Sequence, residues 1–203
     1  MGYFPFFIDI ENKKCVIVGG GNVALRKIEK LLPFNPKITV IAPEICDEIK
    51  ENNKVNILQR NFANSDIENA FMVISATDDN SLNAHIFELC QKNNILINTV
   101  DNKEKCGFIF PALVKKENLT VGISTSGKSP LYAKFLRKKI ESSIDEKCYE
   151  TIDILNKYRN LIKSEINSEE NRKKAFERIL ALCLENGNNI YEKEIKNIVE
   201  DFR

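Results

Sequence analysis

The residues best suited to chemistry follow a short apolar run near the N-terminus. The run Cys15–Val18 leads into three consecutive glycines and then into helical spacing of apolar residues from Asn22. In a G-x-G-x-x-A pattern, Gly19 allows a tight turn, Gly21 lets the backbone approach a pyrophosphate, and Ala24 lets the helix pack closely on the strand. A helix beginning near Asn22 points free N–H groups and the positive end of its dipole at phosphates. The segment therefore predicts a dinucleotide-binding turn.

Further candidates lie at the ends of later apolar runs. Asn22 and Val23 offer backbone groups at the phosphate turn, and Thr77 lies where a nicotinamide ribose is expected, at the end of the fourth predicted strand. Ala76 and Asp78 flank that threonine and are weaker candidates for the same cofactor.

A carboxylate follows the fifth predicted strand. Asp101 comes directly after Ile95–Val100, and ligands of open α/β sheets bind outside the carboxyl ends of the strands. This carboxylate could take a proton during an oxidation, or it could assist the entry of a metal ion. Asp-Asn pairs are also common in ordinary turns, so the residues alone leave both interpretations open.

A hydroxyl-rich loop is the last candidate. Ser124, Ser126, Lys128 and Ser129 surround a flexible glycine before a predicted helix, and together they suit an anionic group. Ser129 as N-cap with Pro130 at the first helical position would also make a simple helix cap, and both interpretations stay open here.

Histidine and cysteine usage argues against a metal site. His85 is the only histidine, and its place beside the apolar stripe of a predicted helix indicates a partly buried structural side chain. The six cysteines are scattered without a C-x-x-C pair, so we expect them to be reduced and mostly buried as small apolar groups. Without a thiolate cluster near the histidine, a zinc site is not expected.

Strands and helices alternate through the first hundred residues, which predicts an α/β fold with a parallel sheet covered on both faces. The expected strands are Cys15–Val18, Lys37–Ile41, Val55–Leu58, Phe71–Ala76 and Ile95–Val100, and the expected helices are Asn22–Leu32 and Ser81–Lys92, the second capped by Asn80.

The pattern changes after Asp101. Two further strands are expected at Phe108–Val114 and Leu119–Ser124, followed by a helix from Pro130. From about Asp145 the chain is expected to be helical to its end, with a break at Asn186-Gly187-Asn188. We therefore predict a Rossmann-like NAD-binding domain at residues 1–112, a small α+β dimerisation segment at 113–144 and a helical domain at 145–203.

Composition limits the partners and the location. The 203 residues are 43% hydrophobic and 29% charged, and 30 basic against 29 acidic residues leave a net charge of +1. This balance gives no overall field for nucleic acid, and no segment resembles a signal peptide or a membrane span. We expect a cytoplasmic protein that binds neither nucleic acid nor membrane.

Several separate blocks of the sequence resemble the precorrin-2 dehydrogenases, the stand-alone relatives of the N-terminal part of siroheme synthase. Their order and spacing match from the first residues to about Ile140, and the last third resembles the family only as a small helical domain. The blocks are Tyr3–Phe7, Val16–Ala24, Ile74–Asp79, Asn98–Asp101, Phe108–Ala112 and Ser124–Pro130.

The resemblance implies oxidation of precorrin-2 to sirohydrochlorin with NAD+ as hydride acceptor, by a homodimer whose middle segment forms the interface. It also implies that Asp101 is the catalytic carboxylate and that Pro43 and Glu44 contact the adenosine. The second strand lacks an acid at the usual ribose-binding position, Glu44 being the nearest carboxylate, and no arginine is present there to favour a 2′-phosphate. The carboxylates of precorrin-2 are the anionic groups that the loop Ser124–Ser129 would meet.

Two alternative functions stay open at this point. In some relatives the same site also inserts iron into sirohydrochlorin, which would make this chain a bifunctional dehydrogenase and ferrochelatase without any metal-binding cluster. A non-catalytic nucleotide-sensing module would explain the glycine turn, but it would not explain Asp101 together with the Phe-Ile-Phe-Pro block and the serine-rich loop.

Overall fold

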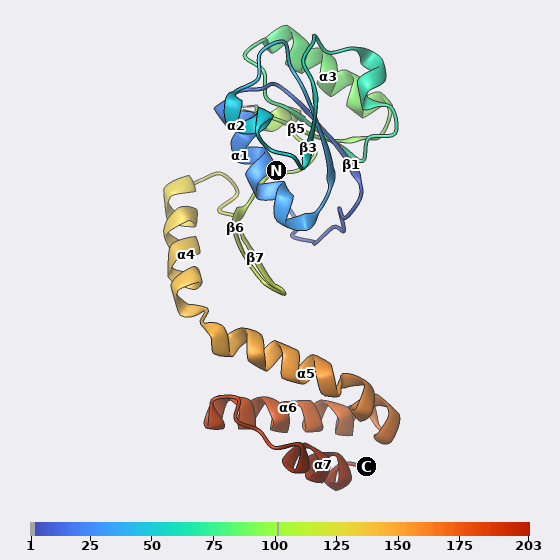
Figure 1. Ribbon diagram of the computed structural model, residues 1–203, viewed down its shortest axis with the longest axis vertical. Helices are drawn as coiled ribbons and strands as arrows, with labels where there is room; N and C mark the ends of the chain where they lie inside the picture. Colours follow the sequence, from blue (N-terminus) through green and yellow to red (C-terminus); the bar gives the residue numbers. More distant parts are fainter. Residues whose placement is uncertain (1–2, 101) are drawn as a thin grey trace. The chain divides into compact units, whose positions relative to one another are not determined.

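Figure 1 shows a computed structural model of the protein, which describes residues 3–100 and 102–203. The chain divides into two compact units, of which the first ends at Pro111 and the second comprises Ala112–Arg203. A separate dimerisation segment at 113–144 and a boundary after residue 144 stay predictions.

The first unit is built on a five-stranded parallel sheet, which confirms the predicted α/β class. The strand order is β3-β2-β1-β4-β5, so the chain reverses its direction of winding between β1 and β4. The strands are β1 (Lys14–Val18), β2 (Lys37–Ile41), β3 (Val55–Leu58), β4 (Met72–Ser75) and β5 (Leu96–Thr99), each within one residue of its predicted ends.

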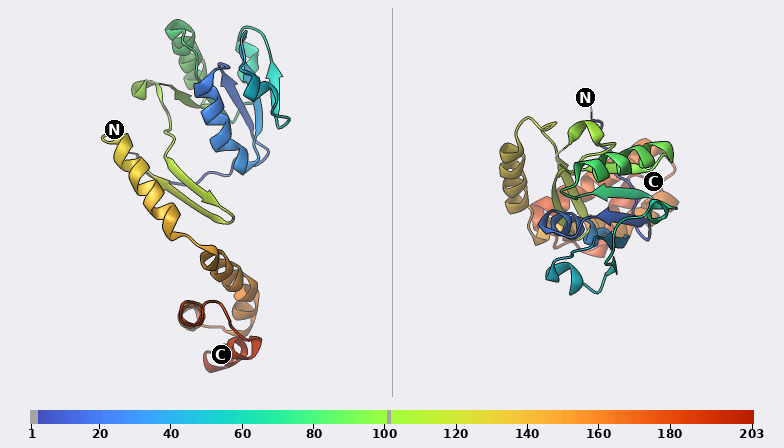
Figure 2. Two further views of the ribbon diagram at one scale, coloured as in Figure 1. Left: turned by 60° about the vertical axis from the view of Figure 1, so that its left-hand side comes forward. Right: turned by 90° about the horizontal axis from the view of Figure 1, so that it is seen from above.

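Helices cover both faces of this sheet (Figure 2). Because neighbouring residues of a strand point to opposite faces, Ile17 meets one helical layer and Val16 the other. The helices are α1 (Asn22–Leu31), α2 (Asp47–Lys50) and α3 (Asn80–Lys92), with short 3-10 turns η1 (Leu32–Phe34), η2 (Asn64–Ile67) and η3 (Lys103–Lys105).

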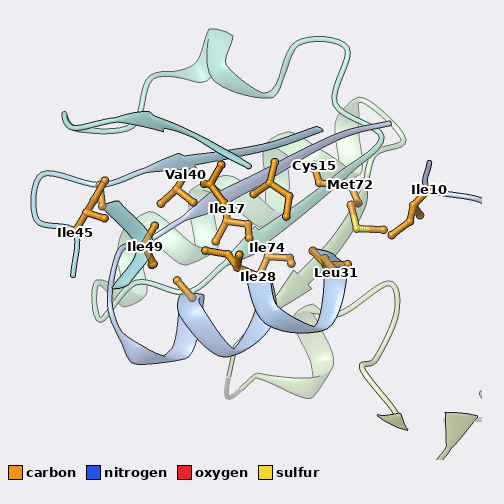
Figure 3. Close-up of a cluster of buried hydrophobic side chains, with 14 residues drawn as sticks. Ile10, Cys15, Ile17, Ile28, Leu31, Val40, Ile45, Ile49, Met72 and Ile74 are labelled. Atoms are coloured by element: carbon orange, nitrogen blue, oxygen red, sulfur yellow. The ribbon is translucent and has the colours of Figure 1, made fainter. Parts of the chain in front are cut away.

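The larger core lies between the sheet and α1 (Figure 3). Spacings of four and three residues put Ala24, Ile28 and Leu31 on one face of α1, where they are buried against Ile17 and Ile74. On the opposite face, α3 buries Ile86 and Cys90 against β4 and β5. Both faces being buried explains why the strands are almost continuously apolar.

The second unit begins with an antiparallel hairpin, β6 (Ala112–Lys116) and β7 (Leu119–Ile123), followed by α4 (Pro130–Ser143). Three helices follow, α5 (Glu146–Glu165), α6 (Glu169–Asn186) and α7 (Glu192–Asp201). Figure 1 shows α5 and α6 side by side, and the core that they share with α7 includes Ile162, Ile179 and Ile195.

Three expectations about the elements were wrong. The strand expected from Phe108 begins only at Ala112, because Pro111 has no N–H to donate to a ladder. The helical tail has an extra break after Glu165, where Ser168 caps α6 by accepting a bond from the Asn171 N–H (3.3 Å).

The third error concerns the start of α3. The N-cap is Asp79 instead of Asn80: its carboxylate accepts bonds from the backbone N–H groups of Ser81 (2.8 Å) and Leu82 (3.0 Å). Within the described ranges, none of the helices combines the length and the apolar character needed to cross a bilayer.

Candidate nucleotide-binding site

The glycine turn after β1 is enclosed by the loops that follow β2 and β4. Gly19 has φ +118°, and a Cβ there would lie 2.2 Å from the carbonyl oxygen of Ala76. A Cβ on Gly20 would lie 2.2 Å from the carbonyl oxygen of Glu44. Both positions therefore require glycine, and the need at Gly20, which the G-x-G-x-x-A pattern does not include, was missed from the sequence.

Gly21 differs from the two glycines before it, because a Cβ there would meet nothing within 4 Å. It is the N-cap residue of α1, and no side chain of the described residues accepts a bond from the first turn, which also lacks an acidic residue. The N–H groups at Asn22 and Val23 thus begin a helix whose positive end faces open space. These residues fit a pyrophosphate, which would accept N–H bonds and lie against the helix dipole.

Thr77 follows β4 and is held by a buried amide. The hydroxyls of Ser75 (2.6 Å) and Thr77 (2.8 Å) both donate to Asn83 Oδ1, and Asn83 Nδ2 donates to the carbonyl oxygen of Thr77 (2.8 Å). This network fixes the backbone at the carboxyl end of β4. Sequence reasoning missed Asn83, although an asparagine beside Ile86 on the apolar face of α3 was a usable signal.

The two aspartates that follow Thr77 have different surroundings. Asp78 is exposed, whereas Asp79 caps α3. A bond from the Ser81 side chain, helped by the backbone N–H groups of Leu82 and Ser81, holds the pKa of Asp79 below its ordinary value. Asp79 is therefore an ionised cap at neutral pH.

At the adenosine end, Pro43 and Glu44 are exposed after β2. The backbone there is tied to the loop after β3, because Gln59 Nε2 donates to the carbonyl oxygen of Pro43 (3.2 Å). Arg60, the next residue, forms a two-pronged ion pair with Asp66 (2.6 and 2.8 Å). The Arg60 guanidinium holds the pKa of the Asp66 carboxyl below its usual range.

The segment after β5 returns to the sheet through several polar contacts, although Asp101 itself lies outside the described residues. Asn98 Nδ2 donates to the carbonyl oxygen of Phe108 (2.9 Å), and Asn98 Oδ1 accepts a bond from Lys27 Nζ (3.3 Å). Next to Asn98, the Thr99 hydroxyl is buried and has no hydrogen-bond partner among the residues that the structure describes.

The thiol of Cys106 contacts two carbonyl groups of this segment. Its sulfur lies 3.2 Å from the carbonyl oxygen of Thr99 and 3.1 Å from that of Asn102. Burial is the largest influence and raises the pKa of the Cys106 thiol, so the S–H group remains protonated and can donate to these carbonyls.

The serine-rich loop belongs to the second unit, whereas the cofactor candidates belong to the first. Ser129 Oγ accepts a bond from the Tyr132 N–H (3.3 Å), and Pro130 is the first residue of α4, so the expected cap is present. Ser124 Oγ accepts a bond from the Ser126 N–H (3.1 Å), while Ser124, Ser126 and Lys128 are exposed. The loop can therefore present hydroxyls and a cation to solvent while it caps the helix.

His85 does not belong to the candidate site. It is exposed instead of partly buried, because it lies one position before the buried Ile86, and its Nε2 lies 2.7 Å from Asn64 Oδ1. Among the described residues no group of His, Cys, Asp and Glu is arranged to hold a metal ion. The cysteines are free, and three of the six, Cys15, Cys90 and Cys183, are buried, fewer than expected.

Comparison with known proteins adds to this geometry. The model for the family described as "Putative NAD(P)-binding" matches residues 6–112, and the one described as "Sirohaem biosynthesis protein central" matches residues 116–143. The siroheme synthase of Thioalkalivibrio sulfidiphilus is 38% identical over 183 residues, 89% of this chain and 37% of that protein. The siroheme synthase of Buchnera aphidicola is 38% identical over 182 residues, 88% of this chain and 38% of that protein.

The chain thus spans well under half the length of these curated relatives. Among solved structures, "SirC, precorrin-2 dehydrogenase" matches with a TM-score of 0.79 and 23% identity over 98% of each chain. At this identity the likeness shows a shared fold.

Proposed function

The chain belongs to the putative NAD(P)-binding family, and we propose on this premise that it is a dehydrogenase that oxidises precorrin-2 to sirohydrochlorin with NAD+. The observation that carries the proposal is the open, uncapped start of α1 on the same sheet edge as the loops after β4 and β5. The similarity to siroheme synthases and the precorrin-2 dehydrogenase fold support the choice of substrate.

Each group of residues at this edge has its own role in the dehydrogenation. The first N–H groups of α1, at Gly21 to Val23, bind the pyrophosphate, and Thr77 with its neighbours Ala76 and Asp78 contacts the nicotinamide ribose. The bound nicotinamide supplies the hydride acceptor. Asp101 takes the proton that precorrin-2 loses with the hydride, so the reaction yields sirohydrochlorin, NADH and a proton. General-base help of this kind is worth about 10²–10⁴ in rate.

The adenosine end favours NAD+ over NADP+. Pro43 and Glu44 border this end, and a carboxylate there suits ribose hydroxyls and repels a 2′-phosphate. Arg60, which follows β3, has its guanidinium engaged by Asp66. A cation already paired in this way is less able to bind the extra phosphate.

The tetrapyrrole carries carboxylates, which need polar donors. We assign this role to Ser124, Ser126, Lys128 and Ser129, whose loop combines exposed hydroxyls with an ammonium group. The turn uses positive φ at Ser126 (+53°) and Gly127 (+76°), and the Ser129 N–H donates to Thr125 Oγ1 (3.2 Å), which holds the loop in its shape.

The working form is a homodimer in the cytoplasm. On α4, Leu131, Tyr132 and Phe135 are exposed by 81%, 55% and 56%, and the two rings stack with centroids 5.9 Å apart. Of the apolar residues of the hairpin, Val114 is buried, whereas Val121 is only partly covered. A second copy would remove these surfaces from water, and free cysteines fit a reducing compartment.

The test is an anaerobic assay of the purified protein with enzymatically made precorrin-2. We expect the absorption spectrum of sirohydrochlorin to develop when NAD+ is present and not when it is omitted. Binding of NAD+ without turnover would contradict the proposal and favour a nucleotide-sensing module. A parallel reaction with ferrous ion distinguishes the bifunctional alternative, which predicts faster siroheme formation than in a protein-free control.

A further inference from the structure

A buried amide joins α1 to the segment that follows β5. The side chain of Asn98, in a residue only 5% exposed, accepts a bond from Lys27 Nζ (3.3 Å) and donates to the carbonyl oxygen of Phe108 (2.9 Å). The Lys27 ammonium also lies 4.1 Å from the centre of the Phe110 ring. Since an unpartnered buried amide is unfavourable, this link holds only while all three segments stay together.

The same link closes the base of the loop at residues 100–105. Asn98 and Cys106 form an antiparallel bridge, and the Gly107 N–H donates to the carbonyl oxygen of Ile97 (2.8 Å). The Cys106 thiol, just after the loop, also contacts the carbonyl oxygens of Thr99 and Asn102. The residues on both sides of position 101 are therefore anchored to the end of β5.

Helix α1 serves both halves of the candidate site. Its N-cap is Gly21, and Lys27 lies six residues further along, about 9 Å up the axis at 1.5 Å per residue. The helix is held rigidly, because Ala24 and Ile28 are fully buried between these two points. A displacement of α1 is consequently shared by the phosphate cradle and the base of the loop.

We propose that Lys27 and Asn98 are positioning residues, which tie the described backbone at Asn98 and Phe108 to the helix that begins at the cofactor-binding turn. This inference rests on the proposed function, because it assigns Asp101 a catalytic role. Neither side chain has to touch the substrate or the cofactor. In the proposed function this backbone leads into and out of the catalytic Asp101, and a misplacement of a catalytic group by about 1 Å costs on the order of a hundredfold in rate.

The central variant is Lys27→Met, which keeps the aliphatic stem and removes the donor and the charge. We expect kcat for precorrin-2 oxidation to fall about 10- to 100-fold, while calorimetry gives an unchanged Kd for NAD+. Lys27→Arg retains a donor and a cation above the Phe110 ring, so it should restore most of the lost kcat. Lys92→Met, which removes an exposed lysine in the last turn of α3, is the matched control and should resemble the wild type.

A second readout does not depend on turnover. Hydrogen exchange of peptides covering residues 99–108 should be faster in Lys27→Met than in the wild type and Lys92→Met, because the Gly107 N–H loses its support. Cys106→Ser, which keeps an O–H donor toward Thr99 and Asn102, should exchange more slowly than Cys106→Val.

Unchanged exchange in a folded Lys27→Met variant would overturn the proposal, as would an equal loss of kcat in Lys27→Arg. If the wild type fails to oxidise precorrin-2, the proposed function is wrong. The exchange measurement still decides in that case whether Lys27 anchors the loop.

Discussion

Gly19 and Gly21 lie in the same turn, but a Cβ atom would have opposite surroundings at the two positions. At Gly19 a Cβ would overlap the backbone of Ala76, whereas at Gly21 it would enter open space beside the first N–H groups of α1. Gly19 therefore serves the packing of two loops, and Gly21 leaves room for a ligand. The two roles can be separated by substitution.

For Gly21→Asp, we expect NAD+ binding to be abolished, because a carboxylate would occupy the place of the pyrophosphate and repel it. The fold should survive, since φ is −93° and the position is open. Calorimetry with NAD+ measures the affinity, and Gly21→Ala controls for the loss of glycine alone. Unchanged affinity in Gly21→Asp would remove the phosphate-turn assignment.

Asp101 and His85 provide the corresponding test of chemistry. Asp101→Ala should lose most turnover, about 10²-fold or more, yet bind NAD+ normally, because the carboxylate acts on the tetrapyrrole. His85→Ala should remain active, since His85 is exposed and pairs with Asn64. Steady-state turnover decides between them, and near-normal activity of the aspartate variant would reverse the roles.

Individual residues could be predicted from the sequence where a local pattern carries the chemistry. The Ser129 cap is such a pattern, since its partner Tyr132 lies three positions away, and the glycine turn is recognised because strand, glycines and helix follow one another directly. The Lys27–Asn98 bond joins residues 71 positions apart, so no local spacing indicates it. The catalytic role of Asp101 stays a prediction, which rests on the resemblance and on the place of this residue after β5.

At the scale of elements, burial explains both the success and the errors of prediction. Strands buried on two faces are continuous apolar runs, and these were found with their ends within one residue. The run Phe108–Phe110 has the same composition but packs its rings against the core outside any strand. Apolar character alone cannot distinguish these cases, and the proline that follows was the usable signal.

The Arg60–Asp66 pair connects the end of β3 to η2 and gives a pH-dependent prediction. The pKa of Asp66 is lowered in the folded protein by the Arg60 bonds, so its contribution to stability is present at neutral pH. It is lost as the pH falls below the ordinary value near 4 toward the lower folded value.

Asp66→Asn should therefore lower the free energy of unfolding at pH 7 by about 1–2 kcal/mol, a figure reduced for the exposure of Arg60. Urea unfolding at pH 7 and pH 3 measures the difference, which should shrink at the lower pH. A difference that grows on acidification would contradict the assigned sign.

At the scale of the whole molecule, the exposed apolar face of α4 and the partly covered hairpin make assembly the central question. Obligate interfaces bury roughly 2,000 Å² or more, so a dimer should withstand dilution. Val121→Asp places a charge in β7 and should give monomer or aggregate, whereas Ser142→Asp, at an exposed position of α4, should not. Light scattering that gives a single-chain mass for the unmutated protein at micromolar concentration would refute the dimer.

The most direct test of the proposed function is the stoichiometry of the two reaction products, NADH and sirohydrochlorin. Under anaerobic conditions, precorrin-2 and NAD+ are mixed with the wild-type protein, and NADH and sirohydrochlorin are both quantified during the reaction. A hydride transfer from precorrin-2 to NAD+ predicts that the two products accumulate in equal amounts and at equal rates. Sirohydrochlorin formed without matching NADH, or no product above the protein-free rate, would contradict it.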